Sequence, residues 1–374
     1  MRFRWLPLGW ALLIGILPAQ TFGEDFHQLP ALTTQRSQLR IYGAADYPAI
    51  APLLQSFQRT HPGVAIEYTE FNTRVLYRKF LDSQGQGPDL MLSSAMDLQI
   101  KLVNDGYAQP HRSAETEALP RWANWRNEIF GFTYEPAVIA INSGFLVDER
   151  LPRSRSELLS LIRRKGGQVR GRIGTFDIEK VGVGYLTWAH DRQQSGSYGR
   201  MLEAFGTHQA RRFPSSASML KALATGEIVI AYNLLGSYAR AWAKQYPVIS
   251  IIMPEDYTAL VMRTAFIPRK ARNTRDAGAF LDFLLSREGQ RLLAEEADLY
   301  PIMDGFVDDE KTASAASGAD IPPQLDDAHV ASLRTLDRSR LQPIPLGLSL
   351  LIHTDQAKRR LILDEWEAAM KSTE

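Results

Sequence analysis

Between residues 39 and 106 the sequence alternates three times between a short apolar run and a segment with apolar residues at helical spacing. The apolar runs cover residues 39–42, 64–68 and 89–92 and predict buried strands. Strands separated by helices pair in parallel, because each helix carries the chain back to the same edge of the sheet. This stretch therefore predicts an α/β fold with a parallel sheet flanked by helices.

The third strand-to-helix junction places two hydroxyl groups where a sheet of this kind binds ligands. Ser93 and Ser94 follow the apolar run, and a helical pattern that ends at Gly106 starts directly after them. The start of a helix presents free backbone N–H groups and the positive end of the helix dipole. Ligands of open α/β sheets bind at the carboxyl ends of the strands. We therefore predict that Ser93 and Ser94 bind a ligand, with simple N-capping by Ser94 as the alternative.

Residues 1–23 have the composition of a secretory signal peptide. Arg2 and Arg4 precede an apolar run over residues 5–17, and small residues precede the expected cleavage point. The apolar run is shorter than the roughly 20 residues that a membrane span needs. The chain has no Cys, which excludes disulfides and cysteine metal sites and suits an oxidising periplasm. We therefore expect a periplasmic protein.

Charge and length narrow the classes of function. Removal of the leader takes away Arg2 and Arg4, so that 43 basic residues become 41 against 42 acidic ones. This balance gives no basis for binding nucleic acid. The remaining length of about 350 residues is enough for two lobes. We expect the first lobe over residues 24–141, the second over residues 142–258, and a return to the first lobe with C-terminal helices over residues 259–374.

The second half of the chain contains two more strand-to-helix junctions. A short strand over residues 171–176 precedes a Gly-x-Gly pattern, which would let backbone approach a ligand closely at the start of a helix. A buried strand over residues 227–233 leads into another helix. The candidate ligand-binding residues at these junctions are Thr175, Gly182, Gly184, Asn233, Gly236 and Ser237.

Four further residues are candidates for the same site. Arg263, on an extended segment that returns to the first lobe, could hold an anion in a bidentate clamp, or form an ordinary ion pair. Tyr134 could wall the pocket or pack in the core. Ala45 and Asp46 follow the first strand. Because Asp46 would repel an anion, it could instead cap a helix or bind a ligand hydroxyl or amine.

Four segments together resemble a known family. They are LRIYG at 39–43, FQRTHPGVAIEY at 57–68, PDLMLSS at 88–94 and GEIVIAYN at 226–233. With the leader, they are similar to the extracellular solute-binding proteins of bacterial ABC transporters, in the ferric-iron and small-anion branch. The resemblance implies a type-II periplasmic binding fold, in which each of two lobes is a mainly parallel sheet flanked by helices. Residues 93–109 are most similar to the periplasmic proteins that regulate phosphoglycerate transport.

The resemblance also bears on iron binding. It implies that members of the ferric branch bind iron through a His, a Glu and adjacent Tyr residues. The matching positions here are residues 43–46, Ser93-Ser94 and residues 233–237, and none carries those ligands. A hard trivalent cation prefers anionic oxygens, which hydroxyl and apolar groups do not replace. We therefore predict that the site binds no metal and no cofactor, with Fe(III) as the lesser alternative.

The sequence offers no catalytic motif. It lacks a phosphate-binding Gly-Lys-Ser/Thr loop, a His-Glu-x-x-His pair and a Gly-x-Ser-x-Gly elbow. We therefore predict a monomeric binding protein rather than an enzyme. It would capture a small anion, such as a phosphate ester or carboxylate, and deliver it to an inner-membrane ABC permease. The alternative is a sensor of such a ligand that signals to a membrane histidine kinase.

Overall fold

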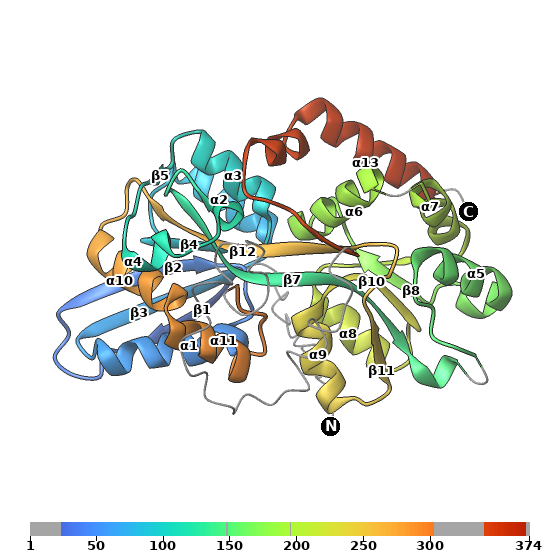
Figure 1. The fold of residues 1–374 in the computed structure, drawn as a ribbon, viewed down its shortest axis with the longest axis horizontal. Helices are drawn as coiled ribbons and strands as arrows, with labels where there is room; N and C mark the ends of the chain where they lie inside the picture. Colours follow the sequence, from blue (N-terminus) through green and yellow to red (C-terminus); the bar gives the residue numbers. More distant parts are fainter. Residues whose placement is uncertain (1–23, 147–148, 195, 303–339, 372–374) are drawn as a thin grey trace, which may run out of the picture.

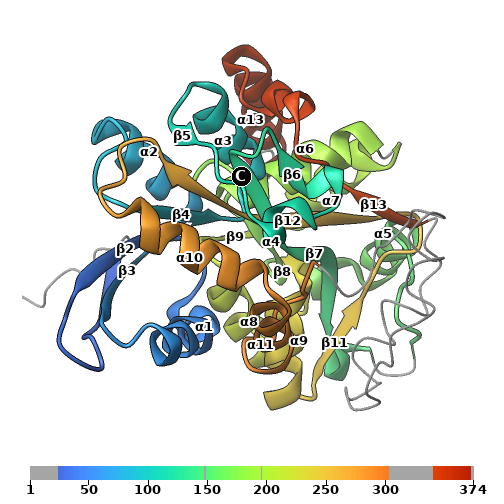
Figure 2. The same cartoon turned by 60° about the vertical axis from the view of Figure 1, so that its left-hand side comes forward.

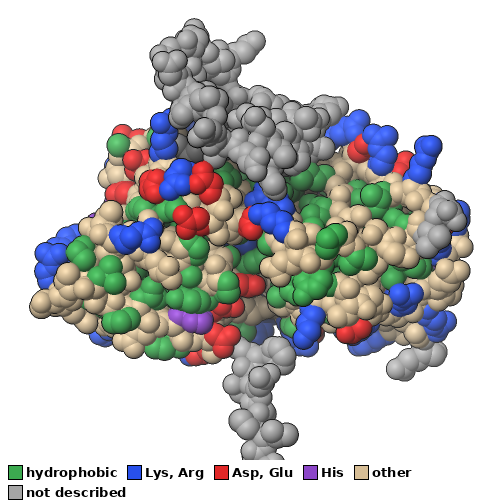
Figure 3. All heavy atoms as spheres, turned by 90° about the horizontal axis from the view of Figure 1, so that it is seen from below, with side chains coloured by type: hydrophobic (Ala, Val, Ile, Leu, Met, Phe, Trp, Pro, Cys, Tyr) green, Lys and Arg blue, Asp and Glu red, His purple; other side chains and the backbone are tan. Residues whose placement is uncertain are grey.

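The computed structural model describes residues 24–146, 149–194, 196–302 and 340–371. The expected signal peptide, residues 1–23, lies outside this part of the chain. Within these ranges, none of the helices combines the length and the apolar character that crossing a membrane requires. On the face seen in Figure 3, Lys and Arg side chains lie interspersed with Asp and Glu and with apolar side chains.

The first half of the chain forms what we call the first strand group, and its inner strands pair in parallel as predicted. Strand β2 lies between β3 and β4 and pairs in parallel with both. The group begins with a strand, β1, whose mixed polar sequence gives no local sign of a strand and which pairs antiparallel with β3, placing Glu24 opposite Phe71. The elements are β1 (Glu24–Leu29), β2 (Ser37–Gly43), α1 (Tyr47–Thr60), β3 (Val64–Phe71), α2 (Thr73–Asp82), β4 (Leu90–Ser93) and α3 (Met96–Asn104).

Two long buried strands leave this group and run through the middle of the molecule (Figure 1). They are β7 (Ile129–Asn142) and β12 (Thr258–Pro268), which pair antiparallel with each other, and β12 also pairs with β4. Every residue of both strands is buried, which explains their nearly continuous apolar sequences. Short elements precede β7: β5 (Ala108–Gln109), α4 (Ala114–Glu117), η1 (Arg121–Ala123) and β6 (Asn124–Trp125).

The far end of β7 pairs with a second strand group. Strand β10 pairs antiparallel with β7 and in parallel with β8, which in turn pairs in parallel with β9. The described strands thus form one large mixed sheet flanked by helices, which confirms the predicted α/β class. The elements are η2 (Ser143–Phe145), α5 (Arg155–Lys165), η3 (Gly166–Val169), β8 (Ile173–Phe176), α6 (Gly182–Gln194), α7 (Tyr198–Thr207), β9 (Arg211–Phe213), α8 (Ser216–Ala224), β10 (Ile230–Leu235), α9 (Gly236–Gln245) and β11 (Ile249–Ile252).

The C-terminal elements divide between the two groups. Helices α10 (Thr274–Leu285) and α11 (Arg287–Glu295) pack against α1 (Figure 2). Strand β13 (Leu341–Pro343) pairs with β12, and η5 (Leu348–His353) contacts α3. Helix α13 (Gln356–Lys371) contacts α7 and buries Trp366 in the core of the second group. The last helix therefore covers the second group, whereas residues 259–374 were expected to complete the first lobe.

Candidate functional site

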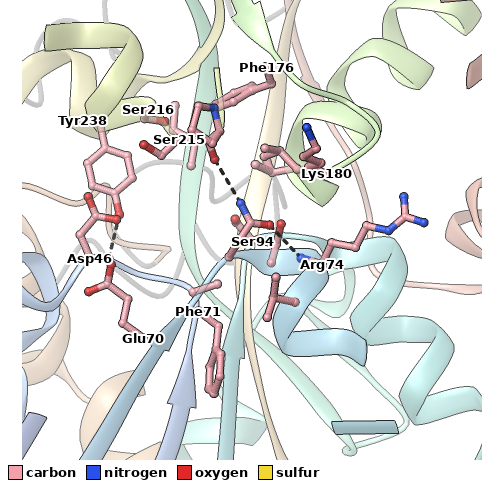
Figure 4. A pocket seen from close by; sticks show the side chains of 18 of the residues that line it. Asp46, Glu70, Phe71, Arg74, Ser94, Phe176, Lys180, Ser215, Ser216 and Tyr238 are labelled. Carbon is pink, nitrogen blue, oxygen red and sulfur yellow. Dashed lines mark hydrogen bonds between the residues drawn. The ribbon is translucent and has the colours of Figure 1, made fainter. Parts of the chain in front are cut away.

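A cavity of about 910 Å³ lies between the two strand groups (Figure 4). Its wall combines residues of the first group, such as Asp46, Asn72 and Ser94, with residues of the second group, such as Lys180 and Ser215. The cavity is therefore made by the approach of two parts of the molecule that are far apart in the sequence. This is the position that ligands occupy in open α/β sheets, beyond the carboxyl ends of the strands.

Six helices of the described chain begin at this wall. The residues at their starts that line it are Asp46 for α1, Asn72 and Thr73 for α2, Ser94 for α3, Val181 and Val183 for α6, Ser215 and Ser216 for α8, and Leu235 and Tyr238 for α9. Each helix start directs the positive end of its dipole toward the cavity, which favours a negative charge there. Local sequence creates two of these starts, because the side chains of Asn72 and Ser215 accept hydrogen bonds from the N–H groups of Arg74 and Ser218.

One side of the cavity carries cationic groups. Arg74, Arg78 and Lys180 line it, and Arg74 and Lys180 lie on the same side in Figure 4. A guanidinium N–H of Arg74 donates to the backbone oxygen of Glu179, across the gap between the strand groups. Burial, together with the positive charges of Arg359 and Arg78, lowers the pKa of Arg74 to about 10. Lys180 forms an ion pair with Asp177 at 2.9 Å.

The opposite side is acidic. Asp46 and Glu70 lie next to each other there, below Tyr238 in Figure 4. One carboxylate oxygen of Glu70 accepts a hydrogen bond of 2.7 Å from the backbone N–H of Tyr47. Burial raises the pKa of Glu70 to about 7, and the charges of Asp46 and Asp25 act in the same direction. Burial also raises the pKa of Asp46, although Arg263 and Tyr238 oppose the shift.

Arg263 of β12 also lines the cavity, as a buried guanidinium. Its side chain is 2% exposed, and its Nε lies 3.5 Å from Glu135 Oε1. The guanidinium carbon lies 5.0 Å from the centre of the Tyr238 ring. Its Nη2 has no hydrogen-bond partner among the described residues. Glu135 therefore anchors Arg263 while leaving a buried donor at the cavity.

Three of the predicted site residues line the cavity, namely Asp46, Ser94 and Arg263. Ser94 does not act as an N-cap, since the N-cap position of α3 is Ala95. The other predicted residues lie outside the wall that the described residues form: Ala45, Ser93, Tyr134, Thr175, Gly182, Gly184, Asn233, Gly236 and Ser237.

Local hydrogen bonds explain why four of these polar or backbone groups do not face the cavity. Asn233, which has a positive φ of 61°, directs its amide at Asp191 with a distance of 2.8 Å. Thr175 accepts a hydrogen bond from the indole of Trp188, and Ser93 accepts one from the N–H of Ala95. The N–H of Ser237 donates to Glu135. These hydrogen bonds are all made within the protein, although the hydroxyl of Ser237 has no hydrogen-bond partner among the described residues.

Close packing accounts for the remaining five. The hydroxyl of Tyr68 bonds both backbone groups of Ala45, and Tyr134 stacks on Trp122. Three glycines allow a close approach by protein atoms: Gly182 faces Ala95, Gly184 faces Phe176 and Gly236 faces Pro136. At Gly182 and Gly184, where the sequence predicted a close approach of backbone to a ligand, the close neighbours belong to the protein itself.

Several residues of the wall were missed by the sequence analysis, among them Glu70, Arg74, Lys180, Ser216 and Tyr238. A signal for Arg74 was present, because Asn72 and Thr73 form the same kind of strand-to-helix junction as Ser93 and Ser94. No comparable signal exists for Glu70, which is one of two glutamates in its strand. The described residues contain no group of three or more His, Cys, Asp or Glu side chains that could hold a metal ion.

Comparisons with known proteins agree with this architecture. Residues 39–296 match the family model of the bacterial extracellular solute-binding proteins. A solved substrate-binding protein of an ABC transporter from Agrobacterium tumefaciens is 31% identical, with a TM-score of 0.83 over 93% of this chain and 98% of its own. A search of curated protein sequences found no match.

Two more distant structures share the fold alone. The periplasmic binding protein AfuA from Actinobacillus pleuropneumoniae, solved with fructose-6-phosphate, has a TM-score of 0.70 at 16% identity over 90% of this chain and 99% of its own. The apo ferric ion-binding protein A from Pasteurella haemolytica has a TM-score of 0.62 at 19% identity over 89% of this chain and 96% of its own. The fold is thus the type-II periplasmic binding fold, and solute-binding proteins of this kind are not enzymes. The chain belongs to the bacterial extracellular solute-binding proteins of ABC transporters.

Proposed function

We propose that this protein captures a small anionic solute, a phosphate ester or a carboxylate, in the cavity between the strand groups and delivers it to an ABC permease. The observation that supports this most directly is the meeting of six helix starts at one cavity that also contains Arg74, Lys180 and Arg263. Helix starts and guanidinium groups are the donors with which proteins bind phosphate and carboxylate groups. A leader peptide at residues 1–23 would export the protein to the periplasm.

The geometry supports capture by closure of two lobes, over residues 24–141 and 142–258, about β7 and β12. Besides the hydrogen bond from Arg74 to Glu179 and one from the N–H of Asp46 to the hydroxyl of Tyr238, two more already join the lobes at the cavity. The Asn72 amide donates to the backbone oxygen of Pro214 at 3.1 Å, and the N–H of Gly182 donates to Thr73 Oγ1 at 2.9 Å. A ligand that contacts both walls would favour the closed arrangement by its differential affinity for the two states. The closed surface would then be what the permease recognises.

The alternative is that closure signals to a membrane histidine kinase. Its support is the resemblance of residues 93–109 to the regulators of phosphoglycerate transport. A permease and ATPase encoded beside this gene would favour import, and a kinase and response regulator would favour sensing. Fe(III) binding has little support, since the described residues offer no three-ligand cluster.

A binding experiment tests the proposal. Calorimetry with a panel of phosphate esters, di- and tricarboxylates and Fe(III) should show binding by at least one organic anion. Lys180→Gln and Ser94→Ala should each weaken that binding about tenfold or more, because each removes a hydrogen bond to a charged group, worth about 1.5–3 kcal/mol. Lys221→Gln is the matched control, because Lys221 is exposed in the last turn of α8, away from the cavity. Binding of Fe(III) alone, or equal affinities for all three variants, would contradict the proposal.

A further inference from the structure

We propose that the solute carries an ammonium group as well as its anionic group, so that the cavity binds a zwitterion. This inference rests on the proposed function and specifies the class of solute. The two kinds of charge occupy opposite sides of the same cavity: Asp46 and Glu70 lie on one side of Ser94, and Arg74 and Lys180 lie on the other (Figure 4). A ligand with a single negative charge would be attracted by one side and repelled by the other.

The carboxylates of the acidic side have no ion-pair partner among the described residues. No Lys, Arg or His side chain of the described residues forms an ion pair with Asp46 or Glu70 within 4.0 Å. Among the described residues, one N–H donates to Glu70; it comes from Tyr47 and occupies one of the two carboxylate oxygens. The neighbouring Asp25 also lines the cavity and adds negative charge. Half-buried carboxylates that repel each other need either protons or a cation.

Arg263 does not supply that cation, although it lies nearby. Its Nε faces Glu135, which is fully buried and offsets part of the guanidinium charge, and the remaining charge acts on Asp46 but not on Glu70. Its Nη2, however, is a buried donor with no hydrogen-bond partner among the described residues. An unpaired buried donor is costly, so this nitrogen requires an acceptor from outside the chain. The wall therefore presents unmatched acceptors and an unmatched donor side by side.

On the basic side, Lys180 already pairs with Asp177, whereas Arg74 and Arg78 form no ion pair within 4.0 Å among the described residues. Arg74 and Arg78 lie one helical turn apart on α2, and the charges of Arg78 and Arg359 both disfavour the charged form of Arg74. An anionic group of the ligand would relieve this repulsion. One molecule with an ammonium group near Asp46 and Glu70 and an anionic group toward Arg74 and Lys180 would satisfy both sides.

Two other occupants of the acidic side are less consistent with the structure. A divalent metal ion would need more ligands, and the described residues offer no cluster of three. A ligand hydroxyl could donate a hydrogen bond to Asp46 or Glu70 but would leave their charges unbalanced. Hydroxyl and ammonium ligands therefore have to be compared directly.

Three phosphate esters make this comparison: O-phosphoethanolamine, 2-hydroxyethyl phosphate and ethyl phosphate. They differ only in the substituent at the end of the ethyl chain, which is an ammonium group, a hydroxyl group or a hydrogen. We expect calorimetry on the wild-type protein to give at least tenfold tighter binding for O-phosphoethanolamine than for either of the others. Equal affinities for the three esters would refute the ammonium while leaving the proposed function intact. Tightest binding of 2-hydroxyethyl phosphate would likewise overturn it in favour of a polyol phosphate. If no organic anion bound at all, the proposed function itself would fail.

Variants of the acidic side provide the second arm. Glu70→Gln keeps an oxygen for the N–H of Tyr47 but removes the charge, and Asp46→Asn does the same at its position. Each should reduce the preference for O-phosphoethanolamine over ethyl phosphate at least fivefold, with little change in the affinity for ethyl phosphate. Glu203→Gln, at an exposed position of α7, is the control and should leave the preference unchanged. A preference that survives both acidic-side variants would show that another part of the protein selects the ligand.

Discussion

Gly182 provides a direct test of whether the two lobes close on each other. It is the first residue of α6 in the second strand group, and its neighbours belong to the first group. A Cβ placed on Gly182 would lie 3.0 Å from Ala95 Cβ, 3.1 Å from Leu98 Cδ1 and 3.1 Å from Thr73 Oγ1. These distances are too short for an ordinary contact. A side chain at this position would therefore oppose the observed approach of the lobes.

The structure sets the size of the effect. Introducing extra methyl groups into a tight contact costs about 1–3 kcal/mol. If the contact forms only in the closed state, this cost appears in binding rather than in folding, and Gly182→Val should weaken ligand binding about 5- to 150-fold. Gly182→Ala adds only the Cβ and should have a smaller effect. Gly199→Val is the control, because a Cβ at Gly199 on α7 would have no heavy atom within 4 Å among those considered.

The assay combines the Kd for O-phosphoethanolamine, measured by calorimetry, with the melting temperature of the ligand-free protein. We expect the Kd to rise in the order Gly, Ala, Val, while the melting temperature of the empty protein changes little. Small-angle scattering of the Val variant should also show that saturating ligand no longer reduces the radius of gyration. A lower melting temperature with an unchanged Kd would mean that the contact is permanent, and the hinge at β7 and β12 would have to be abandoned.

Two further predictions concern buried charges. Arg155→Met should lower the free energy of unfolding, measured in urea, by about 3–5 kcal/mol. Arg155 is 1% exposed, and its loss leaves the buried carboxylate of Asp191, 3.2 Å away, without its cation. A loss below about 1 kcal/mol would contradict this reasoning. Burial raises the pKa of Asp97 from 3.8 to about 6. The carboxyl therefore favours the folded state only when it is protonated. Its contribution to the free energy of unfolding is lost as the pH rises from about 4 through 6. Asp97→Asn should therefore raise the free energy of unfolding by up to about 3 kcal/mol at pH 7.5 and by almost nothing near pH 4; an equal gain at both pH values would assign the effect to packing.

The local pattern of the sequence was sufficient for the fold class. Apolar runs separated by helical patterns predicted the parallel pairing of β2 with β3 and β4, because periodicity is a property of neighbouring residues. Apolar runs likewise identified the segment that became β10, and the extended segment that carries Arg263 became β12. This reasoning failed at residues 24–29, where a mixed polar pattern gave no sign of β1 because the strand depends on pairing with β3.

Local sequence patterns did not determine which side chains face the cavity. Ser93 and Ser94 were predicted together, yet only Ser94 lines the cavity, because successive side chains at the end of a strand point to opposite sides. Asn233 has the composition of a ligand-binding residue, but its positive φ and the buried Asp191 turn its amide into the core. No pattern in the sequence marks such a partner, since Asp191 lies on a different element.

The sequence by itself determined that several helices begin at the carboxyl edge of a sheet, because strand, cap and helix are encoded within a few consecutive residues. Only the tertiary structure decided which of those starts face the ligand and which charges surround it. The paired strands β7 and β12 hold the two strand groups in a fixed relative position. One cavity is therefore lined by Asp46, Glu70, Arg74 and Lys180. The opposition of acidic and basic walls is thus a property of distances between remote segments, and such distances exist only once the chain is folded.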